Sequence, residues 1–370
     1  MAQRGASSAT GSRVRRRSVL PAVGPGSEAG FDEAGVCHVY RLSNLDVPSW
    51  PEALAVAGGG RAAVPATRLD LSAVTAASTM LRIFSEADSA YGAGHMRSAL
   101  VEYLKTTVEP LPAARATSPA VRREFLTVAA QLSYLCGFMC FDDQLHDAAQ
   151  ARCRTALGLA AEANDPDTYA IALRAMSVQA HAVGHCRPAV ELAESAVGAA
   201  SVNRSPEVQA FVAGQLAVAH AVAGNRRAPT AGLVSAERHF ERATSSHVIG
   251  VYRASLAHQR AVVHIWMENP RAAVSSMKES IRSRPATEAR SKVITLARLA
   301  ELKLRAGQVE QAVRTWHRSL DGYPMIRSGR ATTALGALRS CLRPYRGAHE
   351  LNDLLDRASA LEGRPRRPAG

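Results

Sequence analysis

The chain has 370 residues, enough for one extended domain or two compact ones, so the size of the core is not limiting. Apolar residues make up 47% of it but aromatic residues only 5%; alanine, leucine and valine supply the rest, which argues against a β-sandwich and for packed helices. No run approaches the roughly 18 apolar residues of a membrane span. The net charge of +13 favours an acidic partner or nucleic acid over a basic one.

The first 70 residues are rich in glycine and proline, including the run Gly58–Gly60. This density of helix breakers predicts a largely disordered N-terminal segment over 1–70, with at most one helical turn after Pro51. Regular structure is expected to begin at Ser72, as the N-cap of a helix through Val74 and Phe84. From there to about residue 360 we expect helix after helix, with no strand.

A short pattern recurs six times, first in "YGAGHMRSALVEYLKT" at 91–106. Each copy has a small reference residue in its second helix, namely Ala99, Ala149, Ala189, Pro229, Ala273 and Ala312. Seven positions later each copy again has a small residue: Thr106, Ala156, Ala196, Ala236, Ser280 and Ser319. Four copies open on a glycine, which are Gly94, Gly184, Gly224 and Gly307.

A physical reason accompanies each recurring position. A turn glycine supplies the left-handed conformation that ends a helix. Two small residues on one face of the following helix let neighbouring helices approach closely. Each copy is therefore predicted to be a helical hairpin that must stack on its neighbours to bury its apolar face.

The pattern resembles the tetratricopeptide repeat, most closely in the copy at 293–324, where Leu296, Leu299 and Ala300 form the large–large–small set of the first helix. Gly137 takes the small position in the second copy. The family's first-helix tryptophan and tyrosine are missing from most copies, and the reference residues lie 39 to 50 positions apart instead of about 34.

The resemblance implies an all-α, right-handed superhelical solenoid of about six hairpins over 71–325. A degenerate capping hairpin over 326–362 and a basic tail at 363–370 are expected to follow. Within the family, the spacing and phrases such as "YGAGHMRSALVEYL" look like the sensor half of actinobacterial regulators that carry an XRE-class helix-turn-helix. The first 70 residues show no such DNA-binding domain, so the resemblance implies a regulatory sensor without its DNA reader.

Three further patterns of the sequence concern chemistry. The glycines at 92–94 lack the preceding strand, third glycine and lysine of a phosphate loop, so they predict a turn. Cys136, Cys140 and Cys153 could hold zinc or act in redox chemistry, but their positions favour buried packing. The acidic turn "FDDQLHD" at 141–147 favours helix capping over a metal site. No nucleophile or metalloprotease motif is present, so we predict no enzyme, no cofactor and no metal.

In stacked hairpins the first helices line a concave face, and offsets from the turns select the side chains on it. The predicted binding residues are Tyr134, Phe138, Phe141, Arg174, His181, Gln215, His258, Gln259, Arg298, Glu301 and Arg305. Aromatic residues in the early copies and arginines in the late ones predict an extended peptide or protein partner with an acidic or carboxylate group.

The sequence therefore favours a non-catalytic, cytoplasmic regulatory protein, with a role in transcription or development and with reduced thiols. One alternative is direct binding of DNA through the arginine-rich run at 13–17 and the basic C-terminus; nucleic acid is not the favoured partner. A cysteine-based zinc or redox protein is the second alternative. No membrane partner is expected, and a homodimer is left open.

Overall fold

The computed structural model describes residues 29–31, 37–57, 64–203, 205–243, 246–342 and 349–362. Over these residues the protein is all-α, as predicted. The helices are α1 Trp50–Val56, α2 Leu71–Tyr91, α3 Ala93–Tyr103, α4 Pro119–Asp142, α5 His146–Ala163, α6 Pro166–Ala182, α7 Cys186–Asn203, α8 Pro206–Val222, α9 Ala228–Glu241, α10 Ser246–Trp266, α11 Pro270–Ser283, α12 Ala289–Arg305, α13 Val309–Gly322, α14 Gly329–Leu342 and α15 His349–Glu362.

Four short strands accompany the helices, although the sequence predicted none. Strand β1 (Ala29–Phe31) pairs antiparallel with β2 (Cys37–Val39). Strand β3 (Val64–Leu69) pairs parallel with β4 (Ala114–Ala116), which joins the segment before α2 to the segment before α4. The N-cap of α2 is Asp70, whose side chain accepts a hydrogen bond from the Ala73 amide, and not Ser72 as expected.

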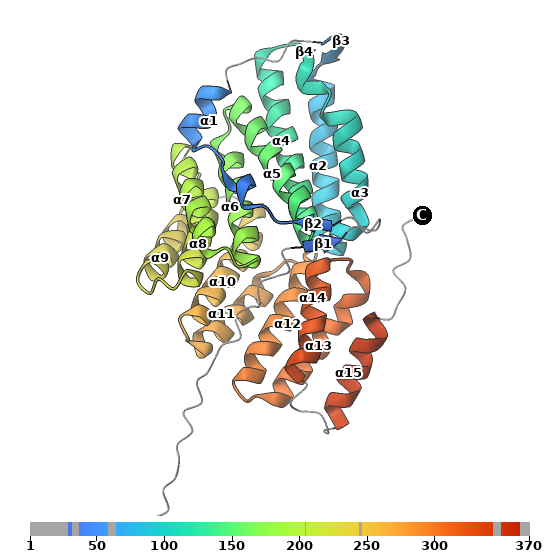
Figure 1. Cartoon of the computed structure of the whole chain (residues 1–370), viewed down its shortest axis with the longest axis vertical. Coiled ribbons are helices and arrows are strands. Elements are labelled where there is room, and N and C mark those ends of the chain that lie inside the picture. Colours follow the sequence, from blue (N-terminus) through green and yellow to red (C-terminus); the bar gives the residue numbers. More distant parts are fainter. Residues whose placement is uncertain are drawn as a thin grey trace, which may run out of the picture.

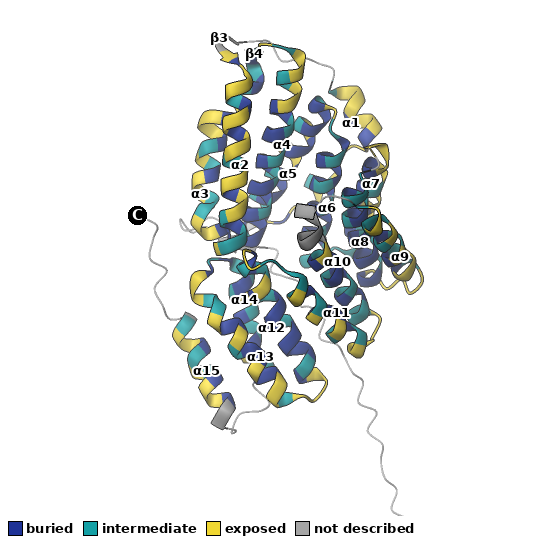
Figure 2. Cartoon of the chain, turned by 180° about the vertical axis from the view of Figure 1, so that it is seen from behind, coloured by how far each residue is buried: buried dark blue, intermediate teal, exposed yellow. Residues whose placement is uncertain are grey.

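From α4 to α13 the helices form successive hairpins, each packed along its length: α4–α5, α6–α7, α8–α9, α10–α11 and α12–α13. The first helices α2, α4, α6, α8 and α10 also contact one another in that order. Figure 1 shows the chain passing from α2–α5 through α6–α9 and α10–α11 to α12–α15. Buried residues concentrate where helices of neighbouring hairpins face each other, while α3 and α15 carry broad exposed faces (Figure 2).

The turns inside the six hairpins share one backbone feature, a residue with positive φ. Two turns without glycine place a longer side chain there at the cost of some strain. The six residues are Gly92, Gln144, Gly184, Gly224, Glu268 and Gly307. In the first hairpin the turn residue is therefore Gly92, whereas the predicted Gly94 lies inside the first turn of α3.

The predicted small positions are buried in five of the six copies, and two of them make the same contact. The hydroxyl of Ser280 donates to the Ala254 carbonyl at 2.7 Å, and that of Ser319 donates to the Val293 carbonyl at 2.9 Å. The first copy is different, because its reference residues Ala99 and Thr106 are exposed. Its helix α3 buries Ala93 and Leu100 instead, so the predicted register was wrong there.

Residues 37–57 were expected to be largely disordered, but they pack across the second helices α5 and α7 (Figure 1). Trp50 is buried edge-on against Tyr169, whose hydroxyl donates to the Pro48 carbonyl at 2.6 Å. The Gln150 amide holds the Arg41 backbone from both sides, accepting from its N–H at 3.0 Å and donating to its carbonyl at 2.8 Å. The predicted helical turn after Pro51 is α1. The arginine-rich run at 13–17 and the basic tail at 363–370 lie outside the described residues.

The chain returns to its first hairpin through α12 and α14. Helix α12 contacts α2, and the segment before α14 pairs with the turn between α2 and α3. Arg327 donates its backbone N–H to the Tyr91 carbonyl at 2.8 Å and accepts from the Gly94 N–H at 3.0 Å. We call this junction, residues 88–97 and 142–144 against 290 and 327–333, the seam. Of the predicted capping hairpin, α14 thus contributes to the seam, while α15 packs on α13 and α14.

Helix α4 is the one helix among the described residues that is long and apolar enough to cross a membrane, by length and composition alone. In this fold 72% of its most apolar window is buried. The hairpin packing accounts for that apolar character, because α4 contacts α2, α3, α5 and α6.

Candidate functional site

The first helices converge on an inner face that carries aromatic and cationic side chains. Tyr134 and Phe138 of α4 are half-buried with their ring centres 6.5 Å apart, and Phe141 follows, edge-on to Phe138 at 6.1 Å. Burial raises the pKa of the Tyr134 phenol, while the nearby Arg174 of α6 opposes the shift. Arg174 itself stacks on the Phe211 ring, with its guanidinium carbon 3.8 Å from the ring centre.

Two histidines on this face are held neutral. Burial, together with Arg298 of α12, lowers the pKa of His181 to about 4. For His258 of α10 the shift is larger, to about 3, because burial is reinforced by repulsion from four guanidiniums: Arg284, Arg330, Arg298 and Arg174. Charges on α6, α10, α12 and α14 therefore act on one another across this face. We call Tyr134, Phe138, Arg174, His181, His258, Arg298 and Arg330 the inner cluster.

Five of the predicted binding residues are not members of that cluster. One of them, Phe141, packs edge-on against Phe138 beside it. Gln215 is buried and donates to the Ser177 hydroxyl at 3.1 Å, and Gln259 is buried and donates to the Phe211 carbonyl at 3.2 Å. Glu301 is buried and pairs with Arg298 at 2.8 Å. Arg305, in contrast, is exposed at the end of α12. Gln215, Gln259 and Glu301 lie on the first helices α8, α10 and α12, as predicted. Because all three side chains are buried, they contribute to helix packing.

The seam contains a buried ion-pair network next to the inner cluster. Arg290 of α12 lies 2.7 Å from an Asp88 carboxylate oxygen and 3.1 Å from one of Asp142, and all three side chains are almost fully buried. Arg330 of α14 lies 4.0 Å from the same Asp142 oxygen. Its guanidinium stands over Phe141, 5.1 Å from the ring centre. These residues join α2, α4, α12 and α14.

The electrostatics of the seam follow from this burial. Desolvation raises the pKa of Asp88 to about 6; Arg290 opposes the shift, while Asp142 adds to it. Burial alone would lower the pKa of Arg290, but Asp88 and Asp142 reverse the effect and the pKa is raised. Asp143, the first residue after α4, pairs with Arg97 of α3 at 2.8 Å. The opposite charges buried in the seam therefore stabilise one another.

We expect Asp88 to make the free energy of unfolding depend on pH. Because its pKa is higher in the fold than in the unfolded chain, the folded state binds more protons between about pH 4 and 6, and stability falls as pH rises through that window. Asp88→Asn removes this contribution. Urea unfolding at about pH 5 and pH 8 should therefore show the variant gaining on the wild type at the higher pH. An equal difference at the two pH values would contradict the assignment.

The ion-pair network of the seam was not predicted from the sequence. Neither Arg330 nor Arg290 was among the predicted binding residues. Asp142 was read as part of a capping turn, yet it is fully buried in an ion pair. The excess of carboxylates in "FDDQLHD" was a signal that a cation from elsewhere in the chain is needed there. Its source, more than 140 residues away, could not be read from local pattern.

The turn at Gly92 is not a phosphate loop, and its glycine has another use. Gly92 has φ +89, and a Cβ built on it would lie 2.3 Å from the Arg327 carbonyl oxygen. Only glycine lets the two backbones approach this closely.

The cysteines expected to pack in the core do so. Cys136, Cys140 and Cys153 are buried within the hairpin α4–α5. Burial raises the pKa of Cys153 to about 12, which disfavours its thiolate, the form that binds metals. Within the described ranges no three histidine, cysteine or acidic side chains are grouped so as to hold a metal ion.

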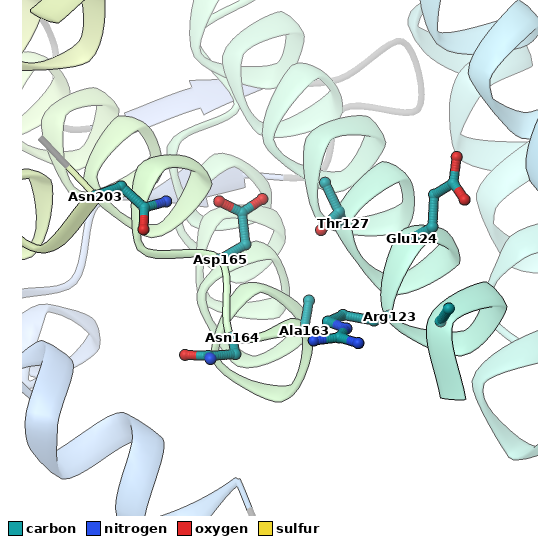
Figure 3. A pocket seen from close by; sticks show the side chains of 8 residues that line it. Arg123, Glu124, Thr127, Ala163, Asn164, Asp165 and Asn203 are labelled. Atoms are coloured by element: carbon teal, nitrogen blue, oxygen red, sulfur yellow. The ribbon is translucent and has the colours of Figure 1, made fainter. Parts of the chain in front are cut away.

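A cleft of about 330 Å³ opens at the outer end of the hairpins (Figure 3). It lies between the start of α4, the turn from α5 to α6 and the end of α7, and its polar lining includes Arg123, Glu124, Asn164, Asp165 and Asn203. The Asp165 carboxylate already caps α6, accepting from the backbone N–H of Thr168 at 3.0 Å and from its hydroxyl at 2.7 Å. We therefore give the cleft no functional role.

The fold and the inner cluster define the molecule as an all-α protein of packed helical hairpins with a cationic and aromatic inner face. Comparison with protein-family models found no matching family, and comparison with curated proteins found no match.

Proposed function

We propose that this chain is a non-catalytic regulatory protein that binds a peptide or protein partner on its inner face. The observation that supports the proposal is the gathering of the inner cluster from α4, α6, α10, α12 and α14. Aromatic rings and arginines on one face suit a partner with apolar side chains and an acidic or carboxylate group.

We also propose that the hairpins form a right-handed solenoid of tetratricopeptide-like repeats, the architecture implied by the family that the sequence resembles. Its support is the repeated positive-φ turn and the recurring contact of Ser280 and Ser319 with the first helix of the same hairpin. A place in transcriptional or developmental regulation, acting in the cytoplasm, follows from the same resemblance. The run at 13–17, on which direct DNA binding would depend, lies outside the described residues.

The test is binding of synthetic peptides that carry acidic residues and a free C-terminal carboxylate. We expect saturable binding by some of them, measured by fluorescence anisotropy, and weaker binding of the same peptides after amidation. Replacing Arg174 and Arg298 by glutamate should reduce the affinity by at least about tenfold, because repulsion replaces charge-assisted hydrogen bonds.

The matched control reverses two arginines on outer helices, Arg187→Glu and Arg314→Glu, both exposed and paired only within their own helix. It should leave the affinity unchanged. Circular dichroism checks that each variant is folded. Absence of binding by every acidic peptide, or equal affinity in the double variant and the control, would refute the proposal.

A further inference from the structure

Residues 37–57 lie along the second helices α5 and α7 and are held there at only a few points (Figure 1). Between residues 39 and 57 the buried side chains are Tyr40, Trp50 and Ala53. Other apolar side chains of the segment are exposed, including Leu42, Leu54 and Val56. A segment of an ordinary core buries most of its apolar side chains, whereas this one contacts the helices as a bound peptide does.

The first point of attachment is Tyr40. Its ring stacks on the His185 ring, with centres 5.2 Å apart and planes inclined by 18°, and lies edge-on to the His146 ring at 6.3 Å. His146 is the first residue of α5, and His185 directly precedes α7. Because Tyr40 is only 5% exposed, the beginnings of these two helices enclose an aromatic side chain.

The second point of attachment is Trp50, the first residue of α1. Its ring lies edge-on to the Tyr169 ring with centres 5.3 Å apart, and the Tyr169 hydroxyl donates to the Pro48 carbonyl at 2.6 Å. Ala53, on the next turn of α1, is buried as well, and α1 contacts both α5 and α7. The two aromatic anchors are therefore ten positions apart, and a short helix presents the second one.

Between the anchors, the helices bind mainly the backbone of the segment. Gln150 of α5 accepts from the N–H of Arg41 and donates to its carbonyl. One helical turn later, Arg154 donates to the carbonyls of Asn44 at 3.1 Å and Asp46 at 3.3 Å. Every peptide has such carbonyl groups, so this recognition does not require one particular sequence between the anchors.

We propose that α5, α6 and α7 form a second binding site, separate from the inner cluster, for an extended segment of a partner protein with two aromatic residues ten positions apart. Residues 37–57 occupy this site in the resting chain. Backbone hydrogen bonds supply affinity, and the surroundings of Tyr40 and Trp50 select aromatic side chains. Because the resident segment is covalently attached, its effective concentration is typically about millimolar, so the partner must displace it.

The test is fluorescence anisotropy of a labelled synthetic peptide of residues 37–57, added to the full-length chain. We expect the Trp50→Ala chain to bind this peptide at least about tenfold more tightly than the wild type, because its own segment has lost an anchor and competes less. Loss of structure does not predict such a gain, and circular dichroism checks that the variant is folded. The matched control Leu54→Ala alters an exposed side chain of the same segment and should bind like the wild type.

Further variants test the recognition itself. The peptide with Trp50→Ala should bind the Trp50→Ala chain at least about tenfold more weakly than the native peptide. A peptide that keeps Tyr40, Trp50 and Ala53 but has a different sequence between the anchors should keep most of the affinity. In the chain, adding Arg154→Ala to Trp50→Ala should weaken binding, because two hydrogen bonds to the peptide are lost. Adding Arg187→Ala instead should not, since Arg187 of α7 is 91% exposed.

The proposal is overturned if the Trp50→Ala chain binds the peptide no better than the wild type, or if the peptide without its tryptophan binds equally well. Loss of binding by the peptide of altered intervening sequence would overturn the partner class. A wild-type dimer that Trp50→Ala converts to monomers, measured by light scattering, would overturn the choice of occupant, since the segment of a second copy would then fill the site. Failure of acidic peptides to bind the inner face would leave this inference standing, because it depends on none of those residues.

Discussion

Arg290→Met is expected to lower the free energy of unfolding by about 3–5 kcal/mol at neutral pH, the usual cost of removing one partner from a buried ion pair. Arg290 compensates two buried carboxylates, at 2.7 Å for Asp88 and 3.1 Å for Asp142. Methionine keeps much of the volume of the side chain and removes its charge. Both carboxylates then remain in the interior, with only Arg330 at 4.0 Å from Asp142.

Urea unfolding followed by circular dichroism measures this loss. Arg187→Met is the control, because Arg187 is 91% exposed and its pair with Glu191 should contribute less than about 1 kcal/mol. The double variant Arg290→Met with Asp88→Asn should recover part of the lost stability, since one uncompensated charge is gone. A loss no larger than that of the control would show that the seam does not depend on this network.

Gly92→Ala is expected to destabilise the fold by on the order of 3 kcal/mol and to open the seam. Gly92 has φ 89 and ψ 168, a region that side-chain-bearing residues rarely enter. A Cβ at this position would also lie 2.3 Å from the Arg327 carbonyl oxygen, so the backbone at Arg327 must move away. That movement breaks the contacts of Arg327 with Tyr91 and Gly94.

Two other glycines separate the cost of the backbone conformation from the cost of the close contact with Arg327. Gly224 and Gly307 also have positive φ, at 83 and 76, but a Cβ built on either meets nothing within 4 Å. Alanine there should cost only about 1 kcal/mol of backbone strain and leave the seam closed. Small-angle X-ray scattering should show a larger radius of gyration for Gly92→Ala alone. If all three variants lose the same stability and keep the same radius, close approach at Gly92 contributes nothing.

The hairpins could be predicted because their signals are local. A turn residue, a small residue five positions later and another seven beyond it lie within a single turn and helix, as at Gly184, Ala189 and Ala196. The register of the first copy was predicted wrongly because "YGAG" contains two glycines. The one in the turn is Gly92, and choosing Gly94 shifted the register of α3 so that Ala99 was expected inside.

The candidate site was predictable only in part, because its geometry depends on how distant segments meet. Offsets from the turns predicted Arg174, His181, His258 and Arg298 on one face, and the charges of Arg174 and Arg298 act on His258 in the fold. The same offsets could not tell which polar groups the neighbouring helix would cover, so Gln215 and Gln259 were expected there too. Docking of residues 37–57 was missed because its anchors, Tyr40 and Trp50, are single aromatic residues in a segment without periodicity.

The contact between Arg290 and Asp88 spans 202 positions of the sequence, and this separation has a consequence for folding. In an ordinary array of hairpins each unit touches only its neighbours, so the ends fray first and stability grows unit by unit. Here the first hairpin packs against α12, so the series of hairpins closes on itself and the first hairpin is not a free end. We therefore expect amide hydrogen exchange in α2 to be as slow as in the middle of the array. Folding should also be slow, because the series closes on itself only after a long loop has lost its freedom.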